Sequence, residues 1–162
     1  LDLTLSDYGT PADCRLTLDA LRREDEIFLP LWEEEYVLCV PRGHPLAGRA
    51  RIELAELQHH DFIECPPCEA HQQTIGLLAC DRLTLNLVAK AESKGLVMAL
   101  VLAGVGISFL PDGLVEDEAG LCTLPVSGPR MFRRIGLCYP AHQTLNPALR
   151  ALIPELAGQG AS

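Results

Sequence analysis

The sequence has neither the long apolar run of a membrane-spanning protein nor the excess of basic residues typical of a DNA-binding domain. Its longest apolar run, 95–107, is shorter than the about 20 residues that a membrane-crossing helix requires, and no signal-peptide pattern opens the chain. Basic residues are scarce too, because 13 Lys and Arg stand against 22 Asp and Glu, for a formal net charge of -9. Since non-specific DNA affinity comes mainly from clustered Lys and Arg, we expect another domain to make any DNA contact. These features predict a soluble, cytoplasmic chain.

Common catalytic signatures are missing as well. The sequence contains no HExxH motif, no P-loop, and no Ser-His-Asp order that includes a nucleophile elbow. We therefore predict that the chain is not an enzyme and holds no cofactor and no metal. It also begins at Leu1 rather than at a methionine, and its first residues alternate apolar and polar as in a strand, which suggests a fragment of a longer protein.

The cysteines do not form the pattern of a secreted disulfide framework. Their number, 7, is odd, and most lie in apolar surroundings, as Cys39 and Cys138 do. Disulfide-rich secreted domains are usually shorter, with even and denser cysteines. Reduced, buried thiols in a cytosolic protein are the better interpretation.

Hydrophobic periodicity and turn residues predict alternating strands and helices. Ser93 is expected to cap a helix that ends at Gly104, and residues 13–24 give no clear signal. The other predicted helices are 52–57, 71–80 and 146–156, and the predicted strands are 1–6, 27–32, 36–40, 61–64, 83–91, 106–110, 121–126 and 131–139. Such alternation indicates βαβ units and a mainly parallel α/β sheet.

Several short segments, taken in order and spacing, resemble the regulatory domain of LysR-type transcriptional regulators. They are LDLTL at 1–5, PLWEEE at 30–35, VPRGHPLA at 40–47, IELAEL at 52–57, DFI at 61–63, LVLAGVGISFLP at 100–111 and LNPAL at 145–149. Each segment alone is weakly specific, but together they cover nearly the whole chain.

The resemblance implies a periplasmic-binding-protein-like α/β fold with two Rossmann-like lobes, two crossovers and a small-molecule effector in the cleft between the lobes. It assigns residues 1–36 and 136–162 to the first lobe and 37–135 to the second. The family's winged helix-turn-helix DNA-binding domain and the opening strand-helix units of the first lobe have no counterpart here, so we expect an incomplete first lobe. The resemblance also implies a homodimer or homotetramer that contacts DNA only through the absent domain.

Ligands of such folds lie beyond the carboxyl ends of strands, facing helix N-termini that favour carboxylates. The candidate effector-binding residues that follow from this position are Ser6, Asp7, Tyr8, Glu64, Cys65, Pro66, His71, Thr74, Glu92 and Ser93. A plain N-cap explains Ser93 equally well, and solvated loop carboxylates explain Asp7 and Glu92. Gly106 completes the set, although a tight turn accounts for it without a ligand.

The sharpest local motif is the CPPC sequence formed by Cys65 and Cys68 with two prolines between them. It could be a redox pair, because a helix N-terminus stabilises a thiolate, or half of a zinc site with His71. The absence of a second CxxC argues against zinc, and no special role is the third interpretation.

Three functions therefore stay open. The first is an effector-sensing domain that binds a small metabolite, such as an organic acid, and shifts an oligomer that carries the DNA-binding domains. The second is a stand-alone periplasmic-type solute-binding module. The third is a thiol-based redox sensor or small thiol enzyme that uses Cys65 and Cys68.

Overall fold

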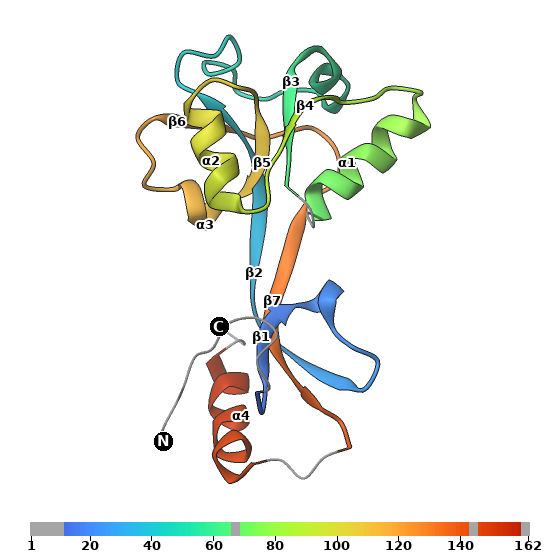
Figure 1. Ribbon diagram of the computed structural model, residues 1–162, viewed down its shortest axis with the longest axis vertical. Coiled ribbons are helices and arrows are strands. Elements are labelled where there is room, and N and C mark those ends of the chain that lie inside the picture. The colour runs from blue at the N-terminus through green and yellow to red at the C-terminus, as the bar shows by residue number, and fades with distance from the viewer. Residues whose placement is uncertain (1–11, 66–68, 143–145, 160–162) are drawn as a thin grey trace. The chain divides into compact units, whose positions relative to one another are not determined.

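The computed structural model of the chain describes residues 12–65, 69–142 and 146–159 (Figure 1). Its strands are β1 (Arg15–Leu18), β2 (Glu26–Pro41), β3 (Asp61–Glu64), β4 (Asn86–Lys90), β5 (Ser108–Pro111), β6 (Leu121–Leu124) and β7 (Phe132–Pro140). Its helices are α1 (Glu69–Cys80), α2 (Lys94–Leu102), α3 (Asp112–Val115) and α4 (Pro147–Gln159), with short 3-10 helices η1 (Asp19–Leu21) and η2 (Leu54–His59).

Tertiary contacts divide the chain into two compact units. Unit 1 consists of Leu1–Glu33 and Arg133–Ser162, and unit 2 is the continuous stretch Glu34–Phe132. One boundary falls inside β2 and the other at the start of β7. The chain therefore enters unit 2 once and leaves it once.

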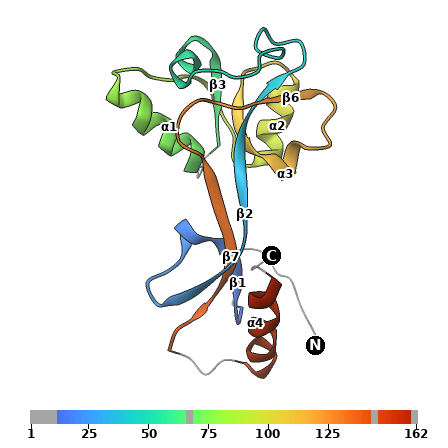
Figure 2. The ribbon, with the colours of Figure 1, turned by 180° about the vertical axis from the view of Figure 1, so that it is seen from behind.

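Unit 1 is built on the antiparallel pairing of β1 with β7, in which residues 15–18 lie opposite 135–138. Gly136 in β7 comes so close to β2 that a Cβ atom there would collide with the carbonyl oxygen of Leu29. A glycine inside a strand commonly marks such a close approach of another backbone. The predicted final helix is confirmed as α4, which contains Pro154 and buries Leu149 (Figure 2).

The β-structure of unit 2 is mixed. Strand β2 pairs antiparallel with both β5 and β6, so that Leu38 lies opposite Phe109 and Leu124. Strand β3 pairs in parallel with β4, the connection being α1, and Phe62 forms a further parallel bridge with Ile107. The β3–α1–β4 segment is thus the βαβ unit that the sequence pattern predicts.

The prediction of a mainly parallel sheet is wrong for the described strands. The β1–β7, β2–β5 and β2–β6 pairs are all antiparallel, and β3–β4 is the parallel strand pair. Alternation along the sequence reports the connection between neighbouring elements, whereas β2 and β7 pair with strands that lie far away in the chain.

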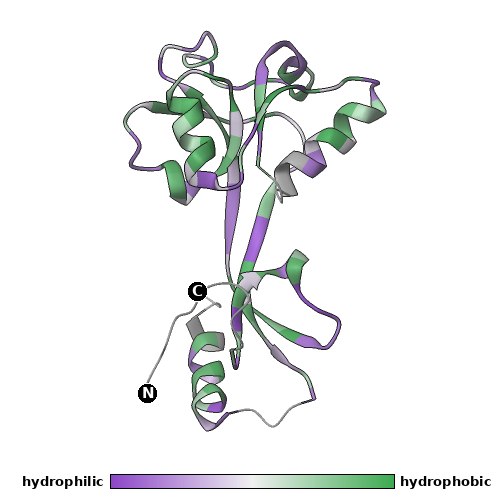
Figure 3. Cartoon of the chain, in the orientation of Figure 1, coloured by the Kyte–Doolittle hydropathy of each residue, from purple (hydrophilic) through white to green (hydrophobic). Residues whose placement is uncertain are grey.

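Two apolar clusters fill unit 2, and β2 contributes to both through its alternating side chains. Leu38 and Val40 belong to one cluster with Phe62 and Phe109. Cys39 belongs to the other, which also holds Val97 and Val101 of α2 and several neighbours. Figure 3 shows the hydrophobic colouring along α2 that this packing requires.

Helix α2 begins and ends where the sequence predicts. The Oγ of Ser93 accepts a hydrogen bond from the backbone N–H of Leu96 at 3.2 Å, which makes Ser93 the N-cap. Gly104 follows the helix with φ +75°, a left-handed conformation that glycine adopts without strain.

Other predicted elements are shifted. The helix expected at 52–57 is η2, two residues later, because Ile52 instead forms a bridge with Val126. The strand expected from residue 83 begins at Asn86, after a turn in which Arg82 has φ 58°. The strand predicted at 1–6 lies outside the described residues.

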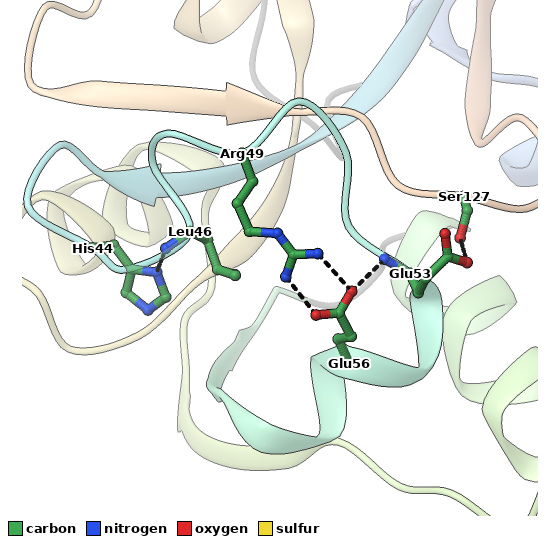
Figure 4. A network of polar contacts seen from close by, with 6 residues as sticks. All are labelled: His44, Leu46, Arg49, Glu53, Glu56 and Ser127. Atoms are coloured by element: carbon green, nitrogen blue, oxygen red, sulfur yellow. Dashed lines mark hydrogen bonds and ion pairs between the residues drawn. The ribbon is translucent and has the colours of Figure 1, made fainter.

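A polar network holds the start of η2 (Figure 4). Glu53 and Glu56 form a capping box, in which the backbone N–H of Glu53 donates to Oε1 of Glu56 at 2.9 Å. Arg49 adds an ion pair with Glu56, Nη2 to Oε1 3.1 Å, and the Ser127 hydroxyl donates to Glu53. The pKa of Glu56 is lowered, first by the hydrogen bond from Arg49.

Candidate functional site

The carboxyl ends of β3 and β4 lie side by side in unit 2. The backbone N–H of Ala91, just after β4, donates to the carbonyl oxygen of Glu64 at 2.8 Å. Across the same strand ends, Nζ of Lys90 lies 3.7 Å from Oε2 of Glu64. Helix α1 follows β3 and helix α2 follows β4, so both helix N-termini face the edge where such folds bind ligands.

The α2 terminus carries two of the predicted site residues. Ser93 has its side-chain oxygen engaged as the N-cap, and Glu92 before it is exposed. The first N–H groups of a helix have no partner inside that helix, and the helix dipole adds a partial positive charge there. This end of unit 2 is therefore suited to an acidic group.

Sequence reasoning missed Lys94, the first residue of α2. Its Nζ is buried and has no hydrogen-bond partner in the described part of the chain. It lies 5.3 Å from the centroid of the Tyr36 ring, a cation–π contact between α2 and β2. A cation at a helix N-terminus opposes the helix dipole, and a lysine directly after the N-cap was the sequence signal that could have drawn attention to it.

Two further residues that the sequence predicts in the effector site are buried. Thr74 in α1 is fully buried, and its hydroxyl donates to Sδ of Met131 at 3.5 Å. Cys65 is 5% exposed and packs in the apolar cluster of Cys39 and Val97. These contacts give both side chains a part in the packing of unit 2.

Gly106 lies beside β3. A Cβ atom there would come within 2.7 Å of the carbonyl oxygen of Asp61, and the N–H of the next residue, Ile107, donates to that oxygen at 2.8 Å. The glycine thus permits the close approach of two backbones.

The remaining candidates are not described. Ser6, Asp7, Tyr8, Pro66 and Cys68 lie outside the described residues, and nothing of the His71 side chain is described, although its backbone belongs to α1. In residues 12–65, 69–142 and 146–159, no group of three His, Cys, Asp or Glu side chains could hold a metal ion.

Unit 2 also contains surface hollows, and they differ from one another in the charge and polarity of their lining. One, of about 750 Å³, is lined by Asp112 and the acidic residues 116–118, together with Arg42, whose Nε donates to the carbonyl oxygen of Ala119. Its carboxylates suit a cation better than an organic acid. Another, of about 380 Å³, is lined by apolar side chains, by Arg51, and by Arg130 paired with Glu35 at 3.1 Å.

A smaller hollow, of about 230 Å³, is lined by histidines that include His44 and His60, whose ring centroids are 5.2 Å apart. Nδ1 of His44 accepts the N–H of Leu46 at 3.2 Å, so this nitrogen is unprotonated. Burial, and then the neighbouring His60, lower the pKa of His44.

The fold defines the class of protein: a periplasmic-binding-protein-like α/β domain. Residues 11–161 match the family described as the LysR substrate binding domain. The chain belongs to this family, whose members are transcriptional regulators. No helix in the described ranges is long and apolar enough to cross a membrane.

The chain is similar to several known regulators. It is 32% identical over 132 residues to an uncharacterized HTH-type transcriptional regulator of Bacillus subtilis, covering 80% of this chain and 45% of the relative. It is 31% identical over 127 residues to the DNA-binding transcriptional dual regulator OxyR of Escherichia coli, covering 74% and 41%. The chain thus spans less than half the length of these relatives.

A solved structure agrees in fold. The CcmR regulatory domain of Synechocystis, in complex with 2-PG, superposes with a TM-score of 0.79 at 18% identity, covering 93% of this chain and 74% of that one.

Proposed function

We propose that this chain is the effector-sensing part of a bacterial LysR-type regulator and that its effector is a small organic acid. The observation that carries the proposal is the position of α2, whose Ser93-capped N-terminus follows β4 where the ends of β3 and β4 meet. Partial positive charge at a helix N-terminus favours a carboxylate. Glu64, Cys65, Glu92 and Ser93 surround these strand ends and are the residues that we expect nearest the effector.

The inter-lobe cleft and the roles of Ser6, Asp7, Tyr8, Pro66, His71, Thr74 and Gly106 in effector binding stay predictions. So does the assignment of residues 1–36 and 136–162 to the family's first lobe and 37–135 to its second. A cytoplasmic location follows from the same proposal, because a regulator must reach the DNA.

The effector would act by population shift. Binding to one arrangement of the sensor favours that arrangement, and an oligomer transmits the change to the DNA-binding domains. Exposed apolar side chains on neighbouring elements support self-association: Ile75 of α1 is 42% exposed, and Leu87 and Val88 of β4 are 47% and 44% exposed. With its net charge of -9, this chain would leave DNA contact to another domain.

The test is a thermal-unfolding screen of the purified chain against small organic acids and their neutral amides. We expect at least one acid to raise the unfolding midpoint in a concentration-dependent manner while its amide does not. The same acid should change the DNA affinity of the full-length regulator. If no metabolite, acidic or neutral, stabilises the chain, the sensor function is contradicted.

Thiol-based sensing is a second candidate. It is favoured by the 31% identity of this chain to OxyR and by its 30% identity to a protein named hydrogen peroxide-inducible genes activator. Peroxide would oxidise one of the two thiols, Cys65 or Cys68, to a sulfenic acid and release water. The other thiol would then attack the sulfenic sulfur, which forms the disulfide and releases a second water. Mass spectrometry of the peroxide-treated chain tests this. Loss of two hydrogens from one peptide supports the pair, and two free thiols contradict it.

A further inference from the structure

The ammonium of Lys94 is in an unfavourable environment. Its Nζ is buried without a hydrogen-bond partner among the described residues, although an ammonium has three donors to satisfy. Burying a charge is costly unless it is paired, and the N-terminus of α2 repels the same charge. The Tyr36 ring, 5.3 Å away, compensates for part of this through its negative face.

A neighbouring lysine shows the ordinary solution. Lys90, at the end of β4, keeps 69% of its side chain exposed and pairs with Glu64 at 3.7 Å. Lys94 is partly exposed as a residue, but its Nζ is buried, and no carboxylate of the described residues pairs with it. The two lysines, four residues apart, thus differ in how their ammonium groups are placed. The Lys90 ammonium is paired with a carboxylate, whereas the Lys94 ammonium is buried and has no hydrogen-bond partner among the described residues.

The backbone beside Lys94 is open. At Gly95, the second residue of α2, no described atom lies within 4 Å of the point that a Cβ would occupy, apart from those of its chain neighbours and of the backbone of its own helix. The early N–H groups of a helix are free of intrahelical partners. An acidic group next to Lys94 could therefore accept hydrogen bonds from the ammonium and from the start of the helix together.

We infer that Lys94 is the residue that recognises the acidic group of the effector, a carboxylate or a phosphate, while Tyr36 holds the ammonium in position. The inference rests on the proposed sensor function and adds the recognition residue to it. An anion that binds here gives the buried ammonium the partner that it lacks. The charge-assisted hydrogen bond that forms then contributes to effector affinity.

The test uses the chain in solution with acetate, benzoate and inorganic phosphate as probes, and with acetamide and benzamide as neutral counterparts. Backbone amide shifts of Lys94 and Gly95 are followed by NMR in the parent chain and in the Lys94→Met and Lys90→Met variants. Methionine keeps the length and apolar stem of lysine, so that packing on Tyr36 is retained.

We expect a saturable shift with at least one anion and none with the amides. Lys94→Met should weaken that binding by roughly tenfold to a hundredfold, whereas Lys90→Met should leave it within about threefold of the parent. Lys94→Met should also unfold at the same temperature as the parent or higher, because a buried unpaired charge is removed. If Lys94 only supported packing, its substitution would lower the unfolding temperature.

The inference is overturned if none of the three anions gives a saturable shift, or if the parent and Lys94→Met bind equally well. A neutral metabolite that stabilises parent and variant alike would overturn the role of Lys94 and leave the sensor function standing. The absence of any stabilising metabolite would instead contradict the sensor function itself.

Discussion

Glu26 of β2 accepts two hydrogen bonds from the guanidinium of Arg15 in β1, Nε to Oε1 at 3.0 Å and Nη2 to Oε2 at 2.5 Å. The Glu26 side chain is only 7% exposed, so this fork-to-fork pair lies largely out of water. The hydrogen bond from Arg15 is the main cause that lowers the pKa of Glu26 to about 2. Nearby, burial raises the pKa of the Cys138 thiol, with a smaller contribution from the charge of Glu26.

This pair predicts a loss of stability in acid. The Glu26 pKa is lower in the folded chain, about 2, than its ordinary value of 4.5. Its contribution is therefore fully present above about pH 4.5 and is lost as the pH falls through about 2. Urea unfolding measured across this range should show the decline.

Glu26→Gln should lower the free energy of unfolding at neutral pH by roughly 1–3 kcal/mol and flatten its decline in acid. Glu33→Gln is the matched control. Glu33 also pairs with an arginine, Arg134 at 3.0 Å, but both side chains are 40% or more exposed, so the cost should stay below about 1 kcal/mol. Equal losses in the two variants would refute the special role of the Glu26 pair.

His44 should titrate below its ordinary pKa of 6.5, because burial and His60 disfavour its charged form. The unfolded chain then binds the proton more readily, so stability is present above about pH 6.5 and is lost as the pH falls below it. An NMR titration of the histidine rings checks this. Titration of His44 above 6.5 would contradict the effect assigned to its burial and to His60.

Ser93→Ala should remove the N-cap of α2 and lower the free energy of unfolding by about 1 kcal/mol. Ser93→Asp should keep the cap, and its carboxylate lies next to Lys94, so we expect stability close to that of the parent. Chemical unfolding of both variants is the measurement. A Ser93→Ala chain as stable as the parent would show that the 3.2 Å bond to Leu96 contributes nothing.

Gly106→Ala should destabilise unit 2 by roughly 1–3 kcal/mol, because the added methyl group would collide with the backbone of β3. Gly76→Ala is the control, since Gly76 lies within α1 with open space around it. There alanine should stabilise the helix by about 0.5–1 kcal/mol. Thermal unfolding of the two variants should move in opposite directions, and a common direction would argue against the contact with Asp61.

The elements that sequence reasoning found correctly are governed by local chemistry. Ser93 and Gly104 delimit α2 through a side-chain cap and a left-handed backbone, and both signals depend on a few adjacent residues. The same holds for β3, found at its predicted bounds, and for the family assignment, which rests on short motifs in order.

What sequence reasoning missed depends on residues brought together by folding. The antiparallel pairing of β2 with β5 and β6 joins distant segments, and strand-helix alternation says nothing about it. Helix α3 has four residues, too few for a periodic signal. The contact between Lys94 and Tyr36 becomes visible only when α2 has packed against the sheet.

Unit 2 is one uninterrupted piece of chain, Glu34–Phe132, and its two ends meet where the N–H of Tyr36 donates to the carbonyl oxygen of Met131 at 2.8 Å. A module with adjoining ends can be transplanted or circularly permuted without stretching its backbone. This continuous segment contains Ser93, Lys94 and Cys65. A gene segment for residues 34–132 is therefore a natural unit for grafting the proposed effector site into another scaffold, whereas unit 1 would have to be rebuilt from two separate segments.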